Sequence, residues 1–359
     1  MWGDNINSLT KLVYINNIKN NIDVIKNQSC SKYMFVAKAI CYNQDFEVAK
    51  YIEESVDYYA VFSLEEGIKL REYNIKKPIL ILKSDITEVE DYIKYDFDIN
   101  LCKLEDICYV NSICKIYNKK IKIHIPINTG MNRFGIKDIN YFRAILVQLH
   151  SLEYIEFYAL YTHLTMPTNN QISNQINLFN NFYKLSNLFG YKPVLHYKST
   201  NYINNELIVD SKDNFVRIGI GNYLKSIKST KDCVELYSKI IEIKEIGSGE
   251  TVGYVCDYIS TCKTKIAVVL GGYADGINKN FIGYKVKIRQ YYCKIIAICM
   301  DVFFVELENN NIKNGDNVCI LNINDDKINL DSLSYYTKQT KYELLVGLRG
   351  RIKTIYKNK

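Results

Sequence analysis

The sequence predicts an α/β protein with an N-terminal (β/α)8 barrel and a C-terminal, mostly β domain. Between residues 34 and 220, eight short apolar runs alternate with amphipathic segments of helix length. Continuous apolar runs are typical of strands buried on both faces, and strands alternating with helices indicate a parallel sheet. From residue 233 onward, β-rich runs follow one another without such helices. These two patterns place a domain boundary near residue 232.

The eight runs fit a closed, TIM-like barrel, which usually has about 250 residues. An open doubly wound sheet is the alternative, but no glycine-rich dinucleotide fingerprint follows the first run. A strand-like piece at Val13–Asn16 and a helix around Ile18–Lys26 precede the runs. The expected barrel strands are Met34–Ala39, Tyr58–Ser63, Pro78–Lys83, Asp98–Cys102, Lys122–Ile127, Phe157–His163, Val194–Lys198 and Phe215–Ile220.

We therefore expect residues 1–232 to form the barrel and residues 233–359 to form the β domain. In the second domain only Thr337–Val346 has a helical pattern, and it ends at Gly347 as helices often do.

Composition narrows the class of protein. The chain has 359 residues and a formal charge of +7 from 46 basic and 39 acidic side chains, without a basic block, so a nucleic-acid partner is not expected. No apolar run is long enough to span a membrane, and the first residues do not resemble a signal peptide. The eleven cysteines stand singly, which predicts reduced thiols in the cytoplasm rather than disulfides or a metal site.

Several predicted strands end in residues that carry chemistry. In such a barrel the C-terminal strand ends form one face, where catalytic groups lie and where phosphate is often bound after strands seven and eight. A tyrosine, Tyr42, follows the lysine at the end of the first strand by one helical turn. At this face we expect Lys38, Arg133, His163, Ser199, Thr200, Arg217 and Gly219.

Each of these residues also has a simpler interpretation. Lys38 alone is typical of a strand that reaches water, His163 of a packed, hydrogen-bonded histidine, and Ser199-Thr200 of a helix cap. The two arginines fit surface ion pairs, and the glycine fits a turn. Together, however, the residues suit an anionic, phosphate-bearing cofactor with an aldehyde for the lysine. Hydroxyl and backbone N–H groups bind phosphate, and arginine supplies donors that cannot be deprotonated.

With these residues in place, the sequence resembles a bacterial alanine racemase, an enzyme of fold type III that uses pyridoxal 5′-phosphate (PLP). The resemblance extends over nearly the whole chain in collinear order. Its strongest pieces are Thr129–Gly135, Val216–Ile220, Gly272–Gly276 and Cys299–Asp301, and weaker ones are Phe62–Gly67 with Leu70-Arg71, and Gly249–Tyr254.

The resemblance implies a role for each matching residue. Lys38 forms the internal Schiff base with PLP and is one base; Tyr254, reaching the site from the partner subunit, is the other, so a homodimer is part of the mechanism. Arg217 meets the pyridine nitrogen and keeps it unprotonated. The remaining cofactor-binding residues are Tyr42, His163, Ser199, Thr200, Gly219, Ile220 and Tyr356, and the substrate side is formed by Arg133, Tyr273 and Met300 together with Tyr254. A hydrogen-bond chain from Tyr254 through His163 to Arg217 is expected to help tune the second base.

The sequence also departs from the family pattern. After Lys38, the stretch Ala39–Asp45 lacks the usual polar residue and both glycines. Pro126 stands where many relatives have a lysine that sets Arg133, and Asn128 replaces an aspartate. Because a buried arginine without a partner is costly, we expect an anion, water or another side chain beside Arg133. Further changes are Ile296-Ala297 for Gly-Arg, Lys353-Thr354 for Pro-Arg, and Ser199-Thr200 for Asn-Ser.

Three hypotheses follow. The first is a racemase that interconverts L- and D-alanine, with D-alanine supplied to peptidoglycan precursors. The second is a racemase of serine or another small amino acid. The third is a PLP-binding paralogue without racemase activity, with a carrier or regulatory role. Retention of Tyr254 argues against the third, because a carrier needs no base on the second face of the substrate.

Overall fold

The structure is a computed structural model that describes residues 8–165, 168–203, 214–308 and 311–358. Within these residues the chain divides into two compact units. The barrel unit comprises Ile18–Cys41 and Phe46–Lys231. The β unit comprises the described residues up to Asn17, the segment Tyr42–Asp45 and the described residues from Asp232 onward. The predicted first domain of residues 1–232 therefore needs correction at its beginning and at Tyr42–Asp45.

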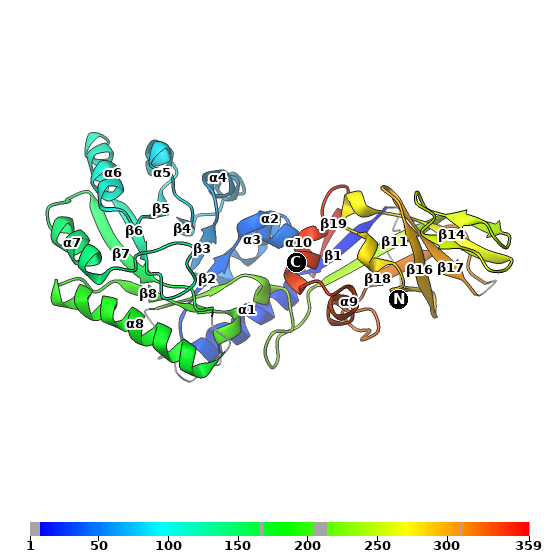
Figure 1. The fold of residues 1–359 in the computed structure, drawn as a ribbon. Helices are drawn as coiled ribbons and strands as arrows, with labels where there is room; N and C mark the ends of the chain where they lie inside the picture. Colours follow the sequence, from blue (N-terminus) through cyan, green and yellow to red (C-terminus); the bar gives the residue numbers. More distant parts are fainter. Residues whose placement is uncertain (1–7, 166–167, 204–213, 309–310, 359) are drawn as a thin grey trace. The chain divides into compact units, whose positions relative to one another are not determined.

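The barrel unit is a parallel sheet that closes on itself, so the predicted (β/α)8 barrel is confirmed (Figure 1). Strands β8 and β9 are separated by Tyr197 alone; β8 pairs with β7 and β9 pairs with β10, which closes the ring. The strands, in their order around the sheet, are β8 (Val194–His196), β7 (Ile155–Tyr161), β6 (Ile121–Pro126), β5 (Phe97–Asn100), β4 (Ile79–Ile81), β3 (Tyr58–Val61), β2 (Lys32–Val36), β10 (Phe215–Ile218) and β9 (Lys198–Ser199).

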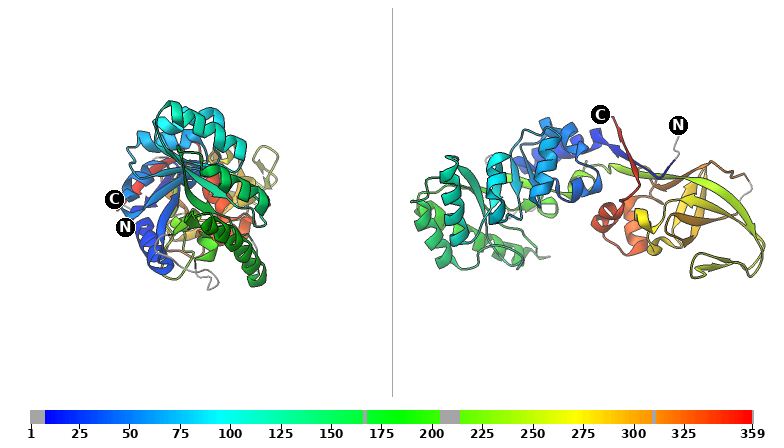
Figure 2. Two further views of the ribbon diagram at one scale, coloured as in Figure 1. Left: turned by 90° about the vertical axis from the view of Figure 1, so that its left-hand side faces the viewer. Right: turned by 90° about the horizontal axis from the view of Figure 1, so that it is seen from above.

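Helices of this unit lie outside the strands, as Figures 1 and 2 show. Helix α8 illustrates why they form: the Thr168 side chain accepts the Gln171 N–H as an N-cap, and Ile172, Ile176 and Phe179 are buried on one face. The helices are α1 (Ile15–Ser29), α2 (Lys38–Asn43), α3 (Glu47–Ile52), α4 (Leu64–Glu72), α5 (Val89–Lys94), α6 (Leu104–Ile116), α7 (Ile139–Leu149) and α8 (Asn169–Leu188).

Burial explains the sequence pattern of the barrel strands. In β2, the consecutive residues Tyr33, Met34 and Phe35 are all fully buried, because one face meets the barrel interior and the other meets the helices. The register of the ladder aligns Pro126 with Tyr161 and Tyr161 with His196, and it aligns Arg217 with Ser199. Two of the predicted site residues, Arg217 and Ser199, therefore lie at paired positions of adjacent strands.

The β unit is built on an eight-stranded sheet in which β14 also pairs with β11. This extra pairing closes six of the strands into a ring, to which β1 and β19 are added. Its strands, in order, are β14 (Thr264–Leu270), β17 (Val302–Leu307), β16 (Tyr291–Ile298), β15 (Lys285–Ile288), β18 (Asn317–Leu321), β11 (Val234–Ile246), β1 (Thr10–Tyr14) and β19 (Lys353–Lys357), and helices α9 (Leu330–Thr337) and α10 (Lys341–Gly347) complete the unit.

Strand β1 explains why the first described residues belong to the β unit. It pairs antiparallel with β11 and parallel with β19, which are both formed by the C-terminal part of the chain. Its sequence shows that it is a strand, but short apolar runs do not specify their partners. Partner choice depends on the fold as a whole.

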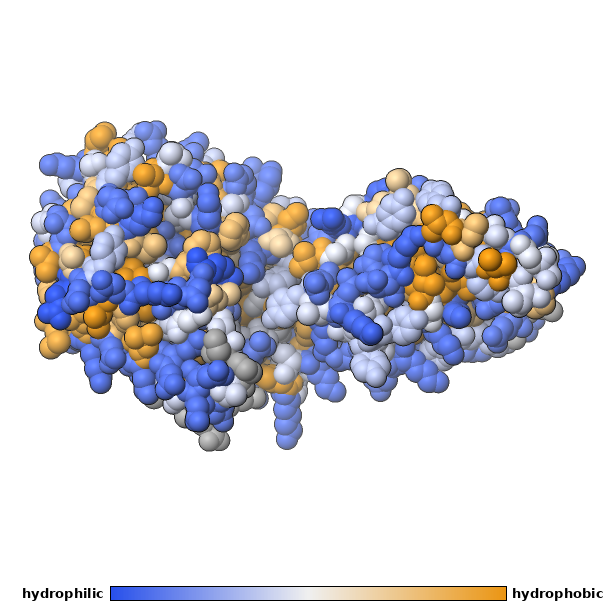
Figure 3. All heavy atoms as spheres, in the orientation of Figure 1, coloured by the Kyte–Doolittle hydropathy of each residue, from blue (hydrophilic) through white to orange (hydrophobic). Residues whose placement is uncertain are grey.

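The outer surfaces of the units are mostly polar. Figure 3 shows hydrophobic residues scattered among hydrophilic ones on the visible face, which is normal for a folded protein. Among the described residues, no helix has the length and apolar character needed to cross a membrane.

Candidate functional site

Lys38 stands where the first barrel strand ends, as predicted. The N–H of Ala37 makes the last bond to the neighbouring strand, donating to Ala60 O at 2.8 Å, and α2 begins at Lys38. From Ala39 to Asn43 every φ lies between 52° and 64°, so α2 is wound left-handed. A left-handed turn costs L-residues about 1–2 kcal/mol each, so its surroundings must impose it.

The Lys38 amine lies in a positively charged environment. Burial, followed by the Arg133 guanidinium, lowers the pKa of Lys38, and Arg217 contributes in the same direction. The carboxylate of Glu66 opposes them and raises this pKa. The net effect increases the neutral fraction of the amine near neutral pH, which suits both condensation with an aldehyde and proton abstraction.

Arg217 is buried and held by several acceptors, so its interpretation as a surface ion-pair partner is wrong. One guanidinium nitrogen lies 2.6 Å from Nδ1 of His196, and the other donates to Thr162 O at 2.8 Å. Burial lowers the pKa of Arg217 to about 10, which leaves the side chain protonated at neutral pH.

Behind Arg217, a buried hydrogen-bond chain crosses the barrel interior. His196 Nε2 lies 2.9 Å from His124 Nδ1, and His124 Nε2 lies 3.4 Å from Asp98 Oδ2, which also accepts the Tyr58 hydroxyl. Because arginine has donors only, each histidine must accept on the side facing Arg217 and donate on the other. Every donor in the chain therefore points away from Arg217 and toward Asp98. Burial lowers the pKa of both histidines, which is consistent with neutral rings.

His163 follows strand β7, as predicted, and its protonation is fixed by the same reasoning. Its Nδ1 lies 3.4 Å from the Arg217 guanidinium and can only accept there. Burial, followed by the charge of Arg217, lowers the pKa of His163 to about 3, so the ring is neutral. Because the neutral His163 ring accepts at Nδ1, it carries its proton on Nε2. Its Nε2–H is therefore available to donate to another group.

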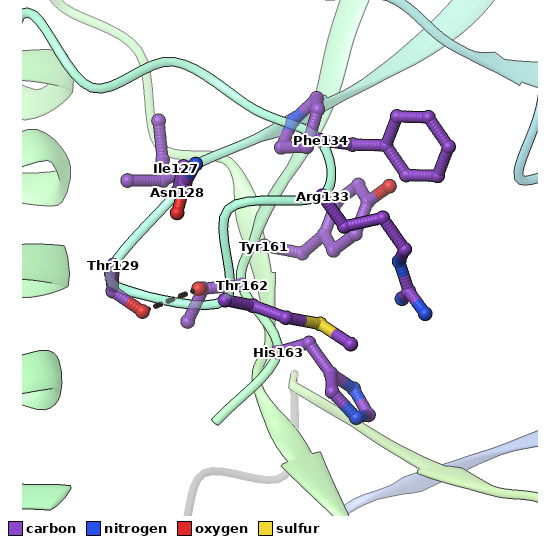
Figure 4. A pocket seen from close by; sticks show the side chains of 10 residues that line it. Ile127, Asn128, Thr129, Arg133, Phe134, Tyr161, Thr162 and His163 are labelled. Atoms are coloured by element: carbon purple, nitrogen blue, oxygen red, sulfur yellow. Dashed lines mark hydrogen bonds between the residues drawn. The ribbon is translucent and has the colours of Figure 1, made fainter. Parts of the chain in front are cut away.

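Arg133 and His163 line one pocket, and their side chains extend to the same side of it (Figure 4). Arg133 is exposed, and its guanidinium lies 5.7 Å from the ring centre of Phe134. The expectation of a buried Arg133 is therefore wrong, and the burial cost that led us to expect a compensating partner beside it does not apply. Asn128 organises the loop that carries Arg133, because its Oδ1 accepts the N–H groups of Gly130 and Asn132, each at 3.1 Å.

The residues of the barrel unit that are expected to bind phosphate meet where β9 and β10 end. Ser199 ends β9 and makes no capping hydrogen bond to the 3-10 turn Thr200–Tyr202, so its interpretation as a helix cap is wrong. Gly219 and Ile220 begin the 3-10 turn after β10. A Cβ on the next residue, Gly221, would lie 2.7 Å from Thr200 Cγ2 and 2.9 Å from its hydroxyl. The glycine thus lets the Thr200 side chain lie against this turn.

Tyr42 and Tyr356 belong to the β unit, where their segments meet. The Tyr356 hydroxyl donates to Gln44 O at 3.0 Å. Lys11, which is only 2% exposed, donates to Asn43 O, and burial lowers its pKa to about 8. No pattern in the sequence points to this buried lysine.

The remaining predicted residues lie on loops of the β unit. Tyr273 and Met300 are adjacent, since the Tyr273 N–H donates to Cys299 O at 3.1 Å, and both side chains are about half exposed. Tyr254 lies in the hairpin between β12 (Thr251–Val252) and β13 (Tyr258–Ile259), and 67% of it is exposed.

The barrel residues fit PLP. Two hydroxyl side chains and a glycine turn at adjacent strand ends suit a phosphate, the Lys38 amine suits an aldehyde, and the buried, protonated Arg217 suits a ring nitrogen that remains unprotonated. Among the described residues, no group of three or more histidine, cysteine or acidic side chains is arranged to hold a metal ion.

Sequence reasoning missed the residues that support the site. His124, His196 and Asp98 are polar residues flanked by buried apolar ones, which is the signal that would have found them; Glu66, on a helix, carries no comparable signal. The left-handed winding of α2 was also missed, because Ala39–Asn43 contains no glycine.

Comparison with known proteins agrees with this geometry. Residues 13–226 match the model of the alanine racemase N-terminal domain, and residues 233–356 match that of the C-terminal domain. The chain is 26% identical to an alanine racemase of Borreliella burgdorferi over 94% of both chains. It is 28% identical to "Alanine racemase 2" of Caldanaerobacter subterraneus over 90% of this chain and 88% of that protein.

Solved structures show the same fold. The alanine racemase of Clostridium difficile 630 aligns with a TM-score of 0.89 at 28% identity and covers 97% of this chain and 95% of its own. A histidine racemase of Leuconostoc mesenteroides aligns equally well, with a TM-score of 0.89, but at 19% identity it shows the fold alone. On these matches, the chain belongs to the alanine racemase family and is a PLP-dependent amino-acid racemase.

Proposed function

We propose that this protein interconverts L- and D-alanine by a two-base mechanism that uses Lys38 and, from a partner subunit, Tyr254. One observation carries the proposal: the Lys38 amine lies within electrostatic reach of Arg133 at the mouth of one barrel. An amino-acid substrate needs a base at its Cα and a cation for its carboxylate. The Lys38 amine, with its lowered pKa, suits the first, and the exposed Arg133 guanidinium suits the second.

PLP, when bound, supplies a conjugated ring that withdraws electrons from the substrate Cα and makes its proton removable. Ser199, Thr200 and the N–H groups of Gly219 and Ile220 would hold its phosphate, joined by Tyr42 and Tyr356. Arg217 would face the ring nitrogen. Because Thr162 O and His196 hold its guanidinium, it would keep one orientation throughout the reaction.

The two bases act on opposite faces of the substrate Cα. Lys38 removes or returns the proton on one face, and Tyr254 does so on the other. The Nε2–H of His163 would donate to the Tyr254 oxygen, which favours loss of the phenolic proton. The exposure of Tyr254 in its hairpin supports a role in a neighbouring subunit's site, with Tyr273 and Met300 shaping substrate access. The active enzyme would then be a homodimer.

Serine is the second candidate substrate. The pocket that contains Arg133 is also lined by Thr129 and Thr162, whose hydroxyls lie 2.8 Å apart (Figure 4). A hydroxymethyl group could hydrogen-bond there, whereas a methyl group gains nothing from these hydroxyls.

We place the reaction in the cytoplasm and propose that its D-alanine serves peptidoglycan precursors.

A chiral assay tests the proposal. The purified protein with PLP would be given L-alanine, L-serine and other amino acids separately, and the D-isomer formed would be measured by chiral chromatography. We expect alanine to turn over fastest; faster serine turnover would favour the second candidate. PLP binding without turnover, and without exchange of the substrate α-proton in deuterated water, would refute racemisation and favour a carrier role.

Two variants test the assigned bases. Lys38→Ala should lose the covalent link to PLP, seen as loss of the borohydride-fixed cofactor on the peptide that contains residue 38. Tyr254→Phe should keep that link but lose nearly all D-alanine formation. If the link persists without Lys38, the cofactor lysine is misassigned.

A further inference from the structure

A carboxylate on α4 contacts the backbone beside the cofactor lysine. Ser63 and Glu66 have the Ser-x-x-Glu spacing of a capping box, in which the glutamate would bond back to the start of its own helix. The structure differs from this pattern: Ser63 makes no capping hydrogen bond. Instead, Glu66 Oε1 accepts the Ala39 N–H at 2.6 Å, and Glu66 Oε2 accepts the Phe62 N–H at 2.7 Å.

These two N–H groups lie directly beyond neighbouring strands. Ala39 is the residue after Lys38, past the end of β2, and Phe62 is the residue after β3. A single side chain thus joins two strand ends on the face where the site lies. Both bonds involve an ionised acceptor and are therefore stronger than bonds between neutral groups.

The hydrogen bond from the Ala39 N–H to Glu66 lies where α2 begins, so it affects the backbone that carries Lys38. Ala39 is the first residue of α2 with left-handed φ, and the first N–H groups of a helix have no acceptor within the helix. An anion at that end is favourable for the helix dipole. Glu66 therefore supports the backbone conformation at the point where Lys38 leaves the sheet.

The charge of Glu66 acts on the lysine as well. The charged groups that act on the Lys38 amine are Arg133 and Arg217, which lower its pKa, and Glu66, which raises it. His163 also faces this group but is neutral near pH 7. Glu66 therefore limits how far the two arginines shift the amine toward its neutral form.

We infer that Glu66 is a positioning residue for Lys38, which sets both the direction in which the lysine leaves β2 and the charge around its amine. The inference rests on the proposed role of Lys38 as the cofactor lysine. Glu66 itself does not need to touch substrate or cofactor.

Three variants separate geometry from charge. Glu66→Gln removes the charge and leaves one acceptor for two N–H groups. Glu66→Asp keeps the charge on a side chain too short to reach both. Glu65→Gln is the matched control, because it removes the same charge from the same first turn of α4, and Glu65 is not among the groups that shift Lys38.

The first readout uses the protein freed of PLP. Acetic anhydride labelling of the Lys38-containing peptide across pH gives the titration midpoint of that amine. We expect Glu66→Gln to lower the midpoint by about half a pH unit or more, because removing a nearby opposite charge favours the neutral amine. Glu66→Asp and Glu65→Gln should leave it near the wild-type value. A midpoint in Glu66→Gln equal to that of the control overturns the charge role.

The second readout is PLP affinity, measured by fluorescence titration. Both Glu66 variants should bind PLP about tenfold more weakly, since each weakens or loses a hydrogen bond from a charged acceptor to the backbone beside Lys38, and Glu65→Gln should bind normally. Wild-type affinity in both Glu66 variants overturns the positioning role. Failure of the proposed function would look different: the wild-type protein itself would not link PLP through Lys38, while the labelling midpoints would still test Glu66.

Discussion

Replacing Asp98 by asparagine tests the directed hydrogen-bond chain in the barrel interior. Asp98 Oδ2 accepts from His124 and from the Tyr58 hydroxyl, and these donors lie at the end of the chain that begins at Arg217. Asparagine has nearly the same shape but carries no charge, and its amide adds a donor where two donors already converge. Arg217 has no acceptor, so the chain cannot reverse its direction to compensate.

The expected loss of stability follows from the bonds affected. A buried hydrogen bond to a charged group contributes about 1.5–3 kcal/mol, and asparagine keeps one neutral acceptor, so the free energy of unfolding should fall by roughly 2–4 kcal/mol. For a unit of this size, each kcal/mol corresponds to about 2–4 °C in Tm. PLP affinity should change by less than about threefold, since Arg217 keeps its bond to Thr162 O, which the substitution leaves intact.

Urea unfolding and thermal melts of Asp98→Asn measure this effect, with Asp23→Asn as the control, because Asp23 is exposed on α1. A double-mutant cycle with His124→Phe adds a stricter test. If the chain acts as a unit, the two losses should be non-additive by more than about 0.5 kcal/mol. Additive losses, or an Asp98→Asn protein as stable as the control, would refute the directed chain.

Three further predictions concern other parts of the molecule. His124, His163 and His196 have lower pKa values in the folded protein than in the unfolded protein, so the unfolded state binds more protons below pH 6.5. The free energy of unfolding should therefore fall by about 1 kcal/mol or more per pH unit from pH 6.5 to 5. Equal free energies of unfolding at pH 7 and pH 5 would contradict this. Gly221→Ala should push Thr200 away and weaken PLP binding about tenfold in a fluorescence titration, whereas Gly247→Ala, where a Cβ meets nothing nearer than 3.5 Å, should not. The pKa of Lys11 is about 8 in the folded protein and 10.5 in the unfolded protein. The free energy of unfolding of the wild type, relative to that of Lys11→Met, should therefore rise by about 1 kcal/mol per pH unit between pH 8 and 10. If the free-energy difference between the two proteins stays constant, Lys11 does not titrate in this range.

The sequence was sufficient to predict the barrel and the positions of its strand ends. Parallel strands buried on both faces are continuous apolar runs, and Lys38, His163 and Arg217 lie at or just beyond the strands where these runs placed them. The sequence was not sufficient for β1, because pairing with β11 and β19 depends on segments more than 200 residues away. Local pattern identifies a strand, but the partner of a strand is decided by the fold.

The chemistry of the site could be predicted only in part. The roles of the residues expected to touch the cofactor follow from the family resemblance and stay predictions, whereas the contacts of supporting residues such as Glu66 depend on the folded structure and not on spacing in the sequence. Arg133 shows the opposite error: an arginine in a site was assumed to be buried, and the structure exposes it beside Phe134. Exposure depends on how a loop leaves its strand, which residue type does not reveal.

The stretch after Lys38 shows why its unusual sequence need not mean an altered site. Five consecutive non-glycine residues, Ala39–Asn43, are left-handed, at an intrinsic cost of about 1–2 kcal/mol each. Contacts offset this cost within each unit. In the barrel unit, Glu66 accepts the Ala39 N–H, while in the β unit the Asn43 side chain donates to Val346 O at 3.0 Å and to Leu348 O at 2.7 Å. Glycine would make this backbone easier to form, whereas here these contacts favour it. The conformation that presents the lysine is therefore set by tertiary contacts, and a sequence without the usual glycines can still adopt it.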